Sequence, residues 1–324
     1  MNWSLLIAQI QLFPDQASNM AGRVDLLFFC LIAITGIVAL AVAAVTLFFL
    51  AKYRRHAAAD RSPAKSSSLA VEITWSVIPL LIFAVLFGWG TKIYFRESVE
   101  PPGALEVHVI GKQWMWKLEH LQGKREINEL HVPIGQTVKL MMTSQDVIHS
   151  FFLPDFRIKE DVLPGRYTTQ WFTPKKVGTF PIFCAQYCGT NHALMIGHVV
   201  VLDPTDFTAW LRTGRETISV AQRGEQLFHS FGCSGCHSPQ SAVRAPPLEG
   251  VYGSQVPLTD GRIVNADARY IRDCILLPKT EAVAGFDPVM PSFQGRLSED
   301  ELFALITYIK SIGSSRPEVA VSNH

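Results

Sequence analysis

The chain has 324 residues, a formal net charge of +1 and 48% hydrophobic residues. This length exceeds what one small core organises, so we expect several domains. The near-zero charge provides no overall attraction to a polyanion, and nucleic-acid binding is therefore not predicted. Apolar residues are concentrated in about the first ninety positions, which indicates a membrane-embedded segment.

Two apolar stretches predict a transmembrane hairpin over residues 24–92. Residues 26–51 carry no charge, and at about 1.5 Å per residue they are long enough to cross a bilayer. Residues 71–90 carry one charge, Glu72, at their edge, and contain Pro79, which a helix packed among membrane neighbours tolerates. Two buried helices of a soluble core are the alternative, but core helices rarely remain apolar on every face for this length.

The loop between the two stretches sets the predicted orientation. Its basic residues outnumber its acids, and such loops remain on the cytoplasmic side. The N-terminal segment 1–23 and everything after about residue 92 should therefore lie on the outer side of the membrane. The charged residues of this loop are Lys52, Arg54, Arg55, Arg61 and Lys65, against Asp60.

Residues 104–203 predict an all-β domain. Short alternating apolar runs, such as Val138, Leu140 and Met142, are separated by proline and glycine breakers. This pattern is typical of a β-sandwich or a barrel.

The six cysteines are two isolated residues and two close pairs. Cys30 lies inside a predicted membrane helix and Cys274 lies beside apolar residues at helical spacing, so we interpret both as apolar core thiols. The spacings of the two pairs argue against a disulfide framework. These pairs are Cys184 with Cys188, and Cys233 with Cys236.

The first pair belongs to the string Cys184-Ala-Gln-Tyr-Cys188-Gly-Thr-Asn-His192-Ala-Leu-Met195, and His149 stands upstream in Asp-Val-Ile-His-Ser. Thiolate, thioether and imidazole ligands favour copper, and a loop that offers them is typical of cupredoxin sites. A second cysteine four residues from the first allows two thiolates to bridge two copper ions. The alternatives are a disulfide beside incidental histidines and a zinc site, for which methionine is a poor ligand.

This string resembles the dicopper centre, CuA, of cytochrome c oxidase subunit II, which implies a cupredoxin-like sandwich. The resemblance implies two bridging cysteines, one histidine on each copper and two weaker ligands. The family commonly has a magnesium-binding glutamate where Gln186 stands; because an amide is a weaker ligand for a hard cation, we expect no magnesium site. The implied copper ligands are Cys184, Cys188, His149, His192, Met195 and the backbone carbonyl of Gln186.

The resemblance extends to two further residues. The stretch Gly111-Lys-Gln-Trp114-Met-Trp116 is similar to the family's aromatic segment, and this implies that Trp114 is where electrons reach the copper centre. Val71-Glu72-Ile-Thr-Trp resembles the family's start of the second helix, where a glutamate marks the mouth of a proton channel into subunit I; Glu72 would take this role. The alternatives are a core aromatic residue and an interfacial charge.

A third domain is predicted over residues 219–314, after a polar linker at 204–218 and before a tail at 315–324. Ser298 and Glu301 form a capping box before an apolar helical pattern, so a helix should close the domain near Gly313. All-α structure is expected.

The second cysteine pair predicts covalent haem in this domain. Cys233-Ser-Gly-Cys236-His237 is a C-x-x-C-H sequence, which attaches c-type haem through two thioethers and places the histidine on iron. After His237 the only methionine is Met290 and the only histidine is terminal, so Met290 is the predicted sixth ligand. The domain resembles cytochrome c, which implies that the Pro246 carbonyl orients the His237 ring.

The combined resemblances are to a caa3-type oxidase of the respiratory chain. They imply an electron-transfer subunit that takes electrons from cytochrome c or a quinol-oxidising complex through haem c and CuA. The electrons pass to haem in subunit I, which reduces oxygen with proton translocation; subunit III is a further expected partner. The alternatives are a subunit of a dicopper nitric oxide reductase and a membrane-anchored electron shuttle without a catalytic partner.

Overall fold

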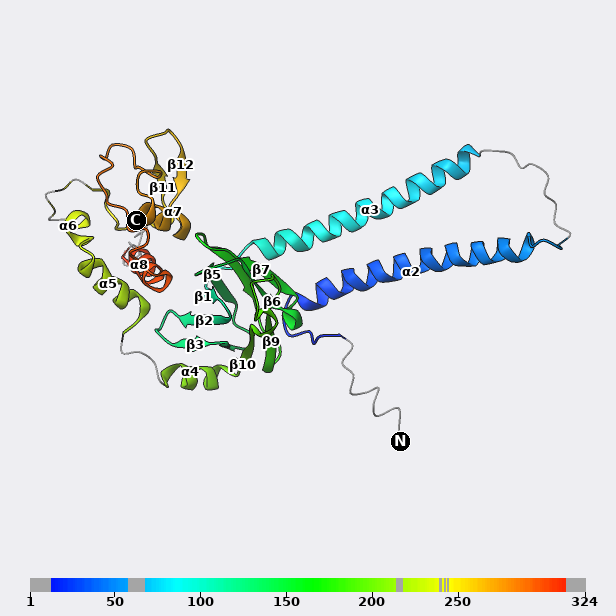
Figure 1. Cartoon of the computed structure of the whole chain (residues 1–324), viewed down its shortest axis with the longest axis horizontal. Helices are drawn as coiled ribbons and strands as arrows, with labels where there is room; N and C mark the ends of the chain where they lie inside the picture. The colour runs from blue at the N-terminus through cyan, green and yellow to red at the C-terminus, as the bar shows by residue number, and fades with distance from the viewer. Residues whose placement is uncertain are drawn as a thin grey trace, which may run out of the picture. The chain divides into compact units, whose positions relative to one another are not determined.

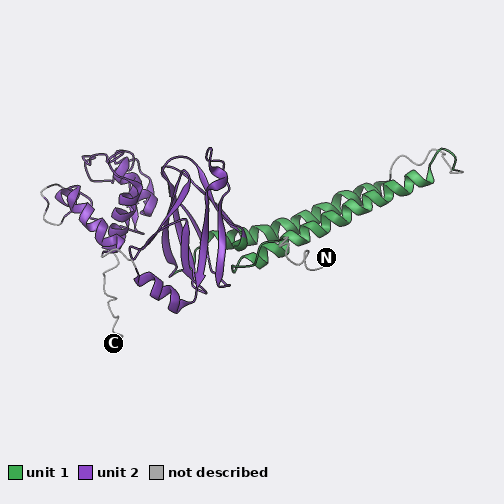
Figure 2. Cartoon of the chain, turned by 60° about the horizontal axis from the view of Figure 1, so that its bottom comes forward, with its two compact units in different colours: residues 1–102, 155–157 green, residues 103–154, 158–324 purple. Residues whose placement is uncertain are grey.

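The computed structural model describes residues 13–57, 68–213, 218–238, 241, 243 and 245–312. The chain divides into two compact units, Met1–Pro102 with Asp155–Arg157, and Gly103–Pro154 with Ile158–His324 (Figure 2). The first unit holds two long helices; the second holds a β-sandwich and a mainly helical C-terminal domain (Figure 1). The predicted fold class is confirmed.

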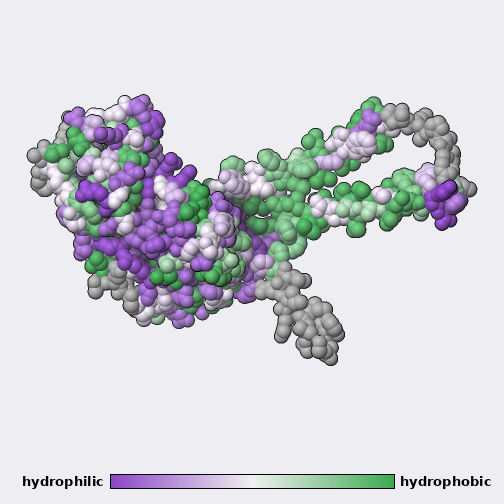
Figure 3. Space-filling view, viewed as in Figure 1, coloured by the Kyte–Doolittle hydropathy of each residue, from purple (hydrophilic) through white to green (hydrophobic). Residues whose placement is uncertain are grey.

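The helices of the first unit are α2 (Ala21–Lys52) and α3 (Leu69–Ser98), both long and apolar enough to cross a membrane. Apolar side chains cover much of their visible surface (Figure 3). Each helix extends beyond its predicted span. Of the charged loop residues, Arg61, Lys65 and Asp60 lie outside the described residues.

A buried ion pair holds the start of α2. Arg157 donates to both carboxylate oxygens of Asp25, at 2.7 Å and 3.0 Å, and to the backbone carbonyl of Asp15 at 2.9 Å. Ser18 Oγ donates to the carbonyl of Phe156 at 2.7 Å. The short segment Asp155–Arg157 is thereby fastened to the first turns of the membrane helix.

The sandwich contains two five-stranded sheets, with strand orders β3-β2-β1-β5-β8 and β4-β10-β9-β6-β7. The β1–β5 and β4–β10 pairs are parallel and the other strand pairs are antiparallel. Fully buried side chains such as Trp116, Leu140 and Phe172 form its core. The strands are β1 (Leu105–Lys112), β2 (Met115–His120), β3 (Arg125–Ile127), β4 (Glu129–Pro133), β5 (Val138–Ser144), β6 (His149–Leu153), β7 (Ile158–Val162), β8 (Thr168–Phe172), β9 (Gly178–Cys184) and β10 (Ile196–Leu202).

The predicted linker at 204–218 contains a helix, α4 (Pro204–Arg212). Pro204 stands in its first turn, where a missing N–H costs nothing, and Phe207 is buried. The Trp210 ring stacks on His131 of β4 with ring centroids 4.4 Å apart. Apolar residues at positions 207, 210 and 211 already signal an amphipathic helix, so part of the expected connector belongs to the folded sandwich.

The C-terminal domain is built on the crossing of two helices, α5 (Val220–Ser230) and α8 (Glu299–Ser311). The predicted capping box is confirmed: Glu301 N donates to Ser298 Oγ, and Ser298 N donates to Glu301 Oε2. Gly224 permits the crossing, because a Cβ there would lie 2.0 Å from the Ala304 carbonyl oxygen. The other elements are α6 (Ser234–His237), α7 (Ala268–Leu276) and a two-stranded sheet, β11 (Gln255–Pro257) with β12 (Ile263–Asn265).

Candidate copper and haem sites

The six predicted copper ligands meet at one end of the sandwich. His149 is the first residue of β6 and Cys184 the last of β9, so the pairing of these strands brings them together. The chain then turns through Cys188 into the short 3₁₀ helix η2 (His192–Leu194) and places Met195 before β10. Strand pairing therefore joins ligands that are far apart in the sequence.

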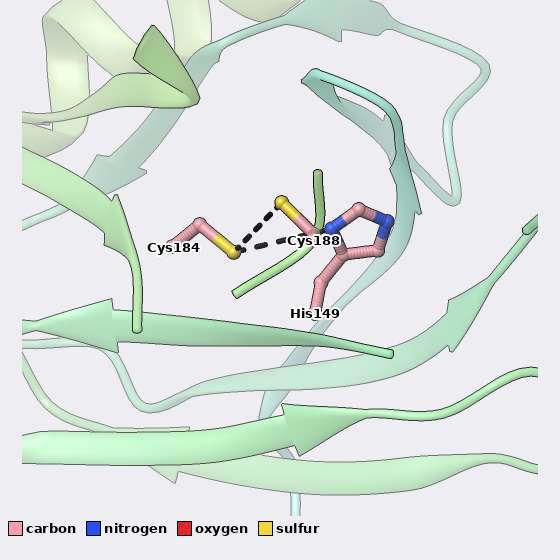
Figure 4. Close-up of side chains that lie close together, drawn as sticks. All are labelled: His149, Cys184 and Cys188. Atoms are coloured by element: carbon pink, nitrogen blue, oxygen red, sulfur yellow. Dashed lines mark hydrogen bonds between the residues drawn. The ribbon is translucent and has the colours of Figure 1, made fainter. Parts of the chain in front are cut away.

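The sulfur atoms lie at the centre of this group. Cys184 Sγ is 3.7 Å from Cys188 Sγ and 3.9 Å from His149 Nδ1, and all three side chains converge (Figure 4). Cys188 Sγ is 3.5 Å from His192 Nδ1 and 3.9 Å from Met195 Sδ. Both cysteines are free and buried, and the sulfur separation is far beyond the roughly 2.05 Å of a disulfide bond. The Gln186 carbonyl oxygen lies 3.2 Å from Cys184 Sγ.

The two thiols differ in acidity. Burial opposes ionisation of Cys184, but hydrogen bonds from His149 and from backbone N–H groups outweigh it and lower the pKa of the thiol to about 6. Burial and the neighbouring thiolate raise the pKa of Cys188 to about 12. Because the raised pKa of Cys188 favours its protonated form at neutral pH, two bridging thiolates would require the release of a proton when copper binds.

Asp146 orients the His149 ring, a role that sequence reasoning missed. Its Oδ1 lies 2.9 Å from His149 Nε2, while the backbone N–H of Gln113 donates to Oδ2 at 2.8 Å. A carboxylate on one ring nitrogen directs the other toward a metal, here Nδ1 toward the Cys184 sulfur. The spacing of three residues between Asp146 and His149 was the available signal. The soft, largely buried donor set fits a copper pair.

Trp114 contacts the copper loop. Its Nε1 donates to the Cys188 carbonyl at 3.2 Å, and Gln113 Nε2 donates to the same oxygen at 2.8 Å. Gly189 allows this approach, because a Cβ there would lie 3.0 Å from Gln113 Nε2 and 3.3 Å from the indole ring. Glu72 is exposed in the first turn of α3 and belongs to the first unit, whereas every other predicted site residue belongs to the second.

A cavity of about 440 Å³ collects the predicted haem residues. Cys233, Cys236, His237 and Met290 all line it, and the walls are mostly apolar. His237 Nδ1 lies 3.1 Å from the Pro246 carbonyl oxygen, which can only accept, so Nδ1 carries the proton and Nε2 is left for a metal. Two thiols, an oriented imidazole and a thioether around an apolar cavity fit a covalently attached haem.

Comparison with known proteins identifies similar domains. The family described as "Cytochrome C oxidase subunit II, periplasmic domain" matches residues 118–202, and the cytochrome c family matches residues 221–313. The chain is 29% identical to cytochrome c oxidase subunit 2 of Alkalihalophilus pseudofirmus over 298 residues, which is 87% of this chain and 84% of the relative.

The chain is also similar to a second relative and to a domain of known structure. The chain is 31% identical to cytochrome c oxidase subunit 2 of Thermostichus vulcanus over 256 residues, covering 62% of this chain and 78% of the relative. In sequence it is 32% identical to the periplasmic domain of cytochrome oxidase subunit II from Bradyrhizobium japonicum, whose crystal structure is known. The TM-score is 0.35, and the match covers 36% of this chain and 96% of the chain in that structure.

Proposed function

The chain belongs to the cytochrome c oxidase subunit II family, a component of an oxidoreductase complex, and on this premise we propose that it is the electron-transfer subunit of a caa3-type oxidase. It would accept electrons from an external donor at haem c and pass them through CuA to haem in subunit I. One observation carries the proposal: two free thiols lie 3.7 Å apart with two imidazoles and a thioether, in the same chain as a C-x-x-C-H cavity.

The copper pair would be held by the donors gathered at the end of the sandwich. Cys184 and Cys188 would bridge the ions, and Asp146 would keep the His149 ring aligned through its hydrogen bond of 2.9 Å. When bound, the pair supplies a one-electron carrier whose charge is shared over two ions. Four of these residues, His149, Cys184, Cys188 and Met195, are buried and would limit water access, which favours transfer of an electron over chemistry on a substrate. The remaining ligands would be His192, Met195 and the Gln186 carbonyl.

The haem would be held by Cys233 and Cys236 through thioethers and by His237 and Met290 on iron. The Pro246 carbonyl would keep the His237 ring in the tautomer that ligates through Nε2, as its 3.1 Å contact supports. A methionine opposite a histidine raises the reduction potential of haem, which suits a carrier that accepts electrons from a cytochrome c or a quinol-oxidising complex. Trp114, in contact with the copper loop, would carry electrons into CuA.

The remaining assignments concern the assembly. The two apolar helices would anchor the chain in the bacterial inner membrane beside subunit I and subunit III, with both ends and the outer domains on the periplasmic side. Glu72, in the first turn of α3, would lie at the mouth of a proton channel used in proton translocation. No magnesium site is proposed at the exposed side chain of Gln186.

The test is purification of the complex in mild detergent, with metal counts, spectra and gas consumption measured on one sample. We expect two coppers and one covalent haem for each copy of this chain, comigration with a haem-containing partner, and reduction of oxygen. Reduction of nitric oxide in place of oxygen would identify a nitric oxide reductase. Migration of the purified chain without a haem-containing partner would identify a free electron shuttle. A single copper, or haem that acid acetone extracts, would contradict the corresponding site.

A further inference from the structure

Strand β1 of the sandwich is buried on both of its faces. Val107 and Val109 point into the sandwich core and are fully buried. On the opposite face, which a two-layer sandwich normally leaves to solvent, His108 is 2% exposed and Ile110 is 3% exposed. Met141, beside His108 on β5, is 4% exposed. Another part of the chain therefore covers this outer face.

Helix α8 of the C-terminal domain provides the cover. The Phe303 ring is stacked between His108, with centroids 4.1 Å apart and planes at 17°, and Tyr167, at 4.8 Å and 19°. Ile110 and Met141 belong to the same buried apolar cluster as the residues of α8. We call the set His108, Ile110, Met141 and Tyr167, with Phe303 opposite, the docking face.

Ion pairs surround the docking face and give it a defined register. Arg223 of α5 binds both carboxylate oxygens of Glu119, at 2.7 Å and 2.8 Å, with both side chains largely buried. Lys310 Nζ lies 2.7 Å from Glu106 Oε2. Bidentate and buried pairs constrain orientation far more than exposed ones, so the contact is specific.

Two further contacts complete this border. Arg272 of α7 donates to the Gly165 carbonyl at 2.7 Å, and Lys117 Nζ lies 3.6 Å from Asp300 Oδ2. The Lys117–Asp300 pair is the more open one, with each side chain about one third exposed, so it is within reach of a chemical reagent.

The docking face connects the two candidate sites. Leu305 and Ile309 of α8 line the haem cavity, while Phe303 of the same helix faces the sheet. Three residues beyond His108, about 10 Å along β1, Gly111 meets the ring of His149, and a Cβ there would lie 2.9 Å from that ring. One helix and one strand thus form a continuous packed link from the cavity wall to a copper ligand.

We propose that the docked arrangement is the working position from which the haem domain delivers electrons to the copper centre, with His108 and Phe303 as positioning residues. The inference rests on the proposed function. With haem held by Cys233, Cys236, His237 and Met290 and copper held at the end of the sandwich, the step would be the transfer of one electron, with no bond made or broken and no proton moved. Delivery then needs no swing of the haem domain on its connecting segment, in contrast to a tethered carrier that searches for its acceptor.

A covalent cross-link between the sandwich and the C-terminal domain tests whether the docked arrangement transfers electrons. A carbodiimide would join Lys117 to Asp300 in the full-length protein within its oxidase complex, and mass spectrometry of peptides would identify the bond. We expect the bond to form and the rate of haem-to-copper electron transfer, measured after rapid photoreduction, to stay within about twofold of the unlocked rate and to be independent of solvent viscosity. A locked protein that no longer transfers electrons would overturn the proposal, as would a viscosity-dependent rate in the wild type.

Charge variants supply the matched comparison. Lys310→Glu faces Glu106 with a like charge, and we expect a lower cross-linking yield and transfer slowed by about tenfold or more. Lys310→Arg should restore both readouts, and Lys175→Glu, an exposed lysine away from the docking face, should change neither. Equal behaviour of Lys310→Glu and Lys175→Glu would refute the role of the contact. Cross-linking needs no metal, so a protein that cross-links but binds no copper would contradict the proposed function and leave the docking contact standing.

Discussion

Glu106 should make the stability of the outer domains depend on pH. Its carboxylate is 8% exposed and lies 3.3 Å from His108 Nε2 and 2.7 Å from Lys310 Nζ. Burial alone would raise the pKa of Glu106, but the hydrogen bond to His108 and the charge of Lys310 outweigh it and lower the pKa from 4.5 to about 2. The folded protein therefore favours the ionised form.

The direction and the size of the pH effect on stability follow from the difference between the folded and unfolded pKa of Glu106. Because the folded pKa lies below the unfolded one, the stabilisation is complete above about pH 4.5 and is lost as the pH falls toward about 2. Each unit of pKa difference is equivalent to about 1.4 kcal/mol of folding stability, so a pKa lowered from 4.5 to about 2 stabilises the folded protein by about 3 kcal/mol. About half of this stabilisation remains near pH 3.

The assay compares wild type with Glu106→Gln, which removes the titrating group. The free energy of unfolding would be measured from urea titrations of the full chain in detergent, followed by tryptophan fluorescence, at several pH values between 7 and 2. The difference between the two proteins should shrink by about 3 kcal/mol across this range. Glu225→Gln, on the exposed side of α5, is the control. Parallel pH profiles for wild type and Glu106→Gln would refute the reasoning.

Three further predictions concern the sites and the core. Cys188→Ser should reduce the copper content from two ions to at most one per chain by elemental analysis, because one bridging thiolate is lost; two retained coppers would contradict the bridge. Met290→Ala should keep the covalent haem but lower its reduction potential by on the order of 0.1 V in a redox titration, and an unchanged potential would exclude Met290 as a ligand. Gly224→Ala should destabilise the C-terminal domain by about 3 kcal/mol in thermal or urea unfolding, because its Cβ would overlap the Ala304 carbonyl oxygen, whereas Glu225→Ala on the same helix should be nearly neutral.

Much of the candidate chemistry was visible in the sequence because its residues lie close together along the chain. Cys184, Cys188, His192 and Met195 share one loop, and the structure gathers them within a few ångströms. The membrane helices and the capping box at Ser298 were also predictable, because helical pattern and capping depend on residues within a few turns.

Other features became visible only in the folded structure. His149 is 35 residues from Cys184 in the sequence. Its side-chain chemistry made it a candidate copper ligand, and the family resemblance then assigned it to the copper centre. Asp146 stands three residues before His149 in the sequence, but its role depends on the folded geometry, in which its carboxylate oxygen lies 2.9 Å from His149 Nε2. The helix at Pro204–Arg212 was missed because its polar residues suggested a linker, although its aromatic residues Phe207 and Trp210 pack on the sandwich.

The sequence by itself determined the two apolar helices, the residue types of the candidate metal sites and the closing helix, because each depends on local pattern and chemistry. Only the tertiary structure decided that both faces of β1 are covered. The run Glu106-Val-His108-Val alternates polar and apolar residues, which is the pattern of a strand with one face in water. Lys310 lies 204 residues away from Glu106, and only the packing of α8 on the sheet turns that polar face into a buried contact.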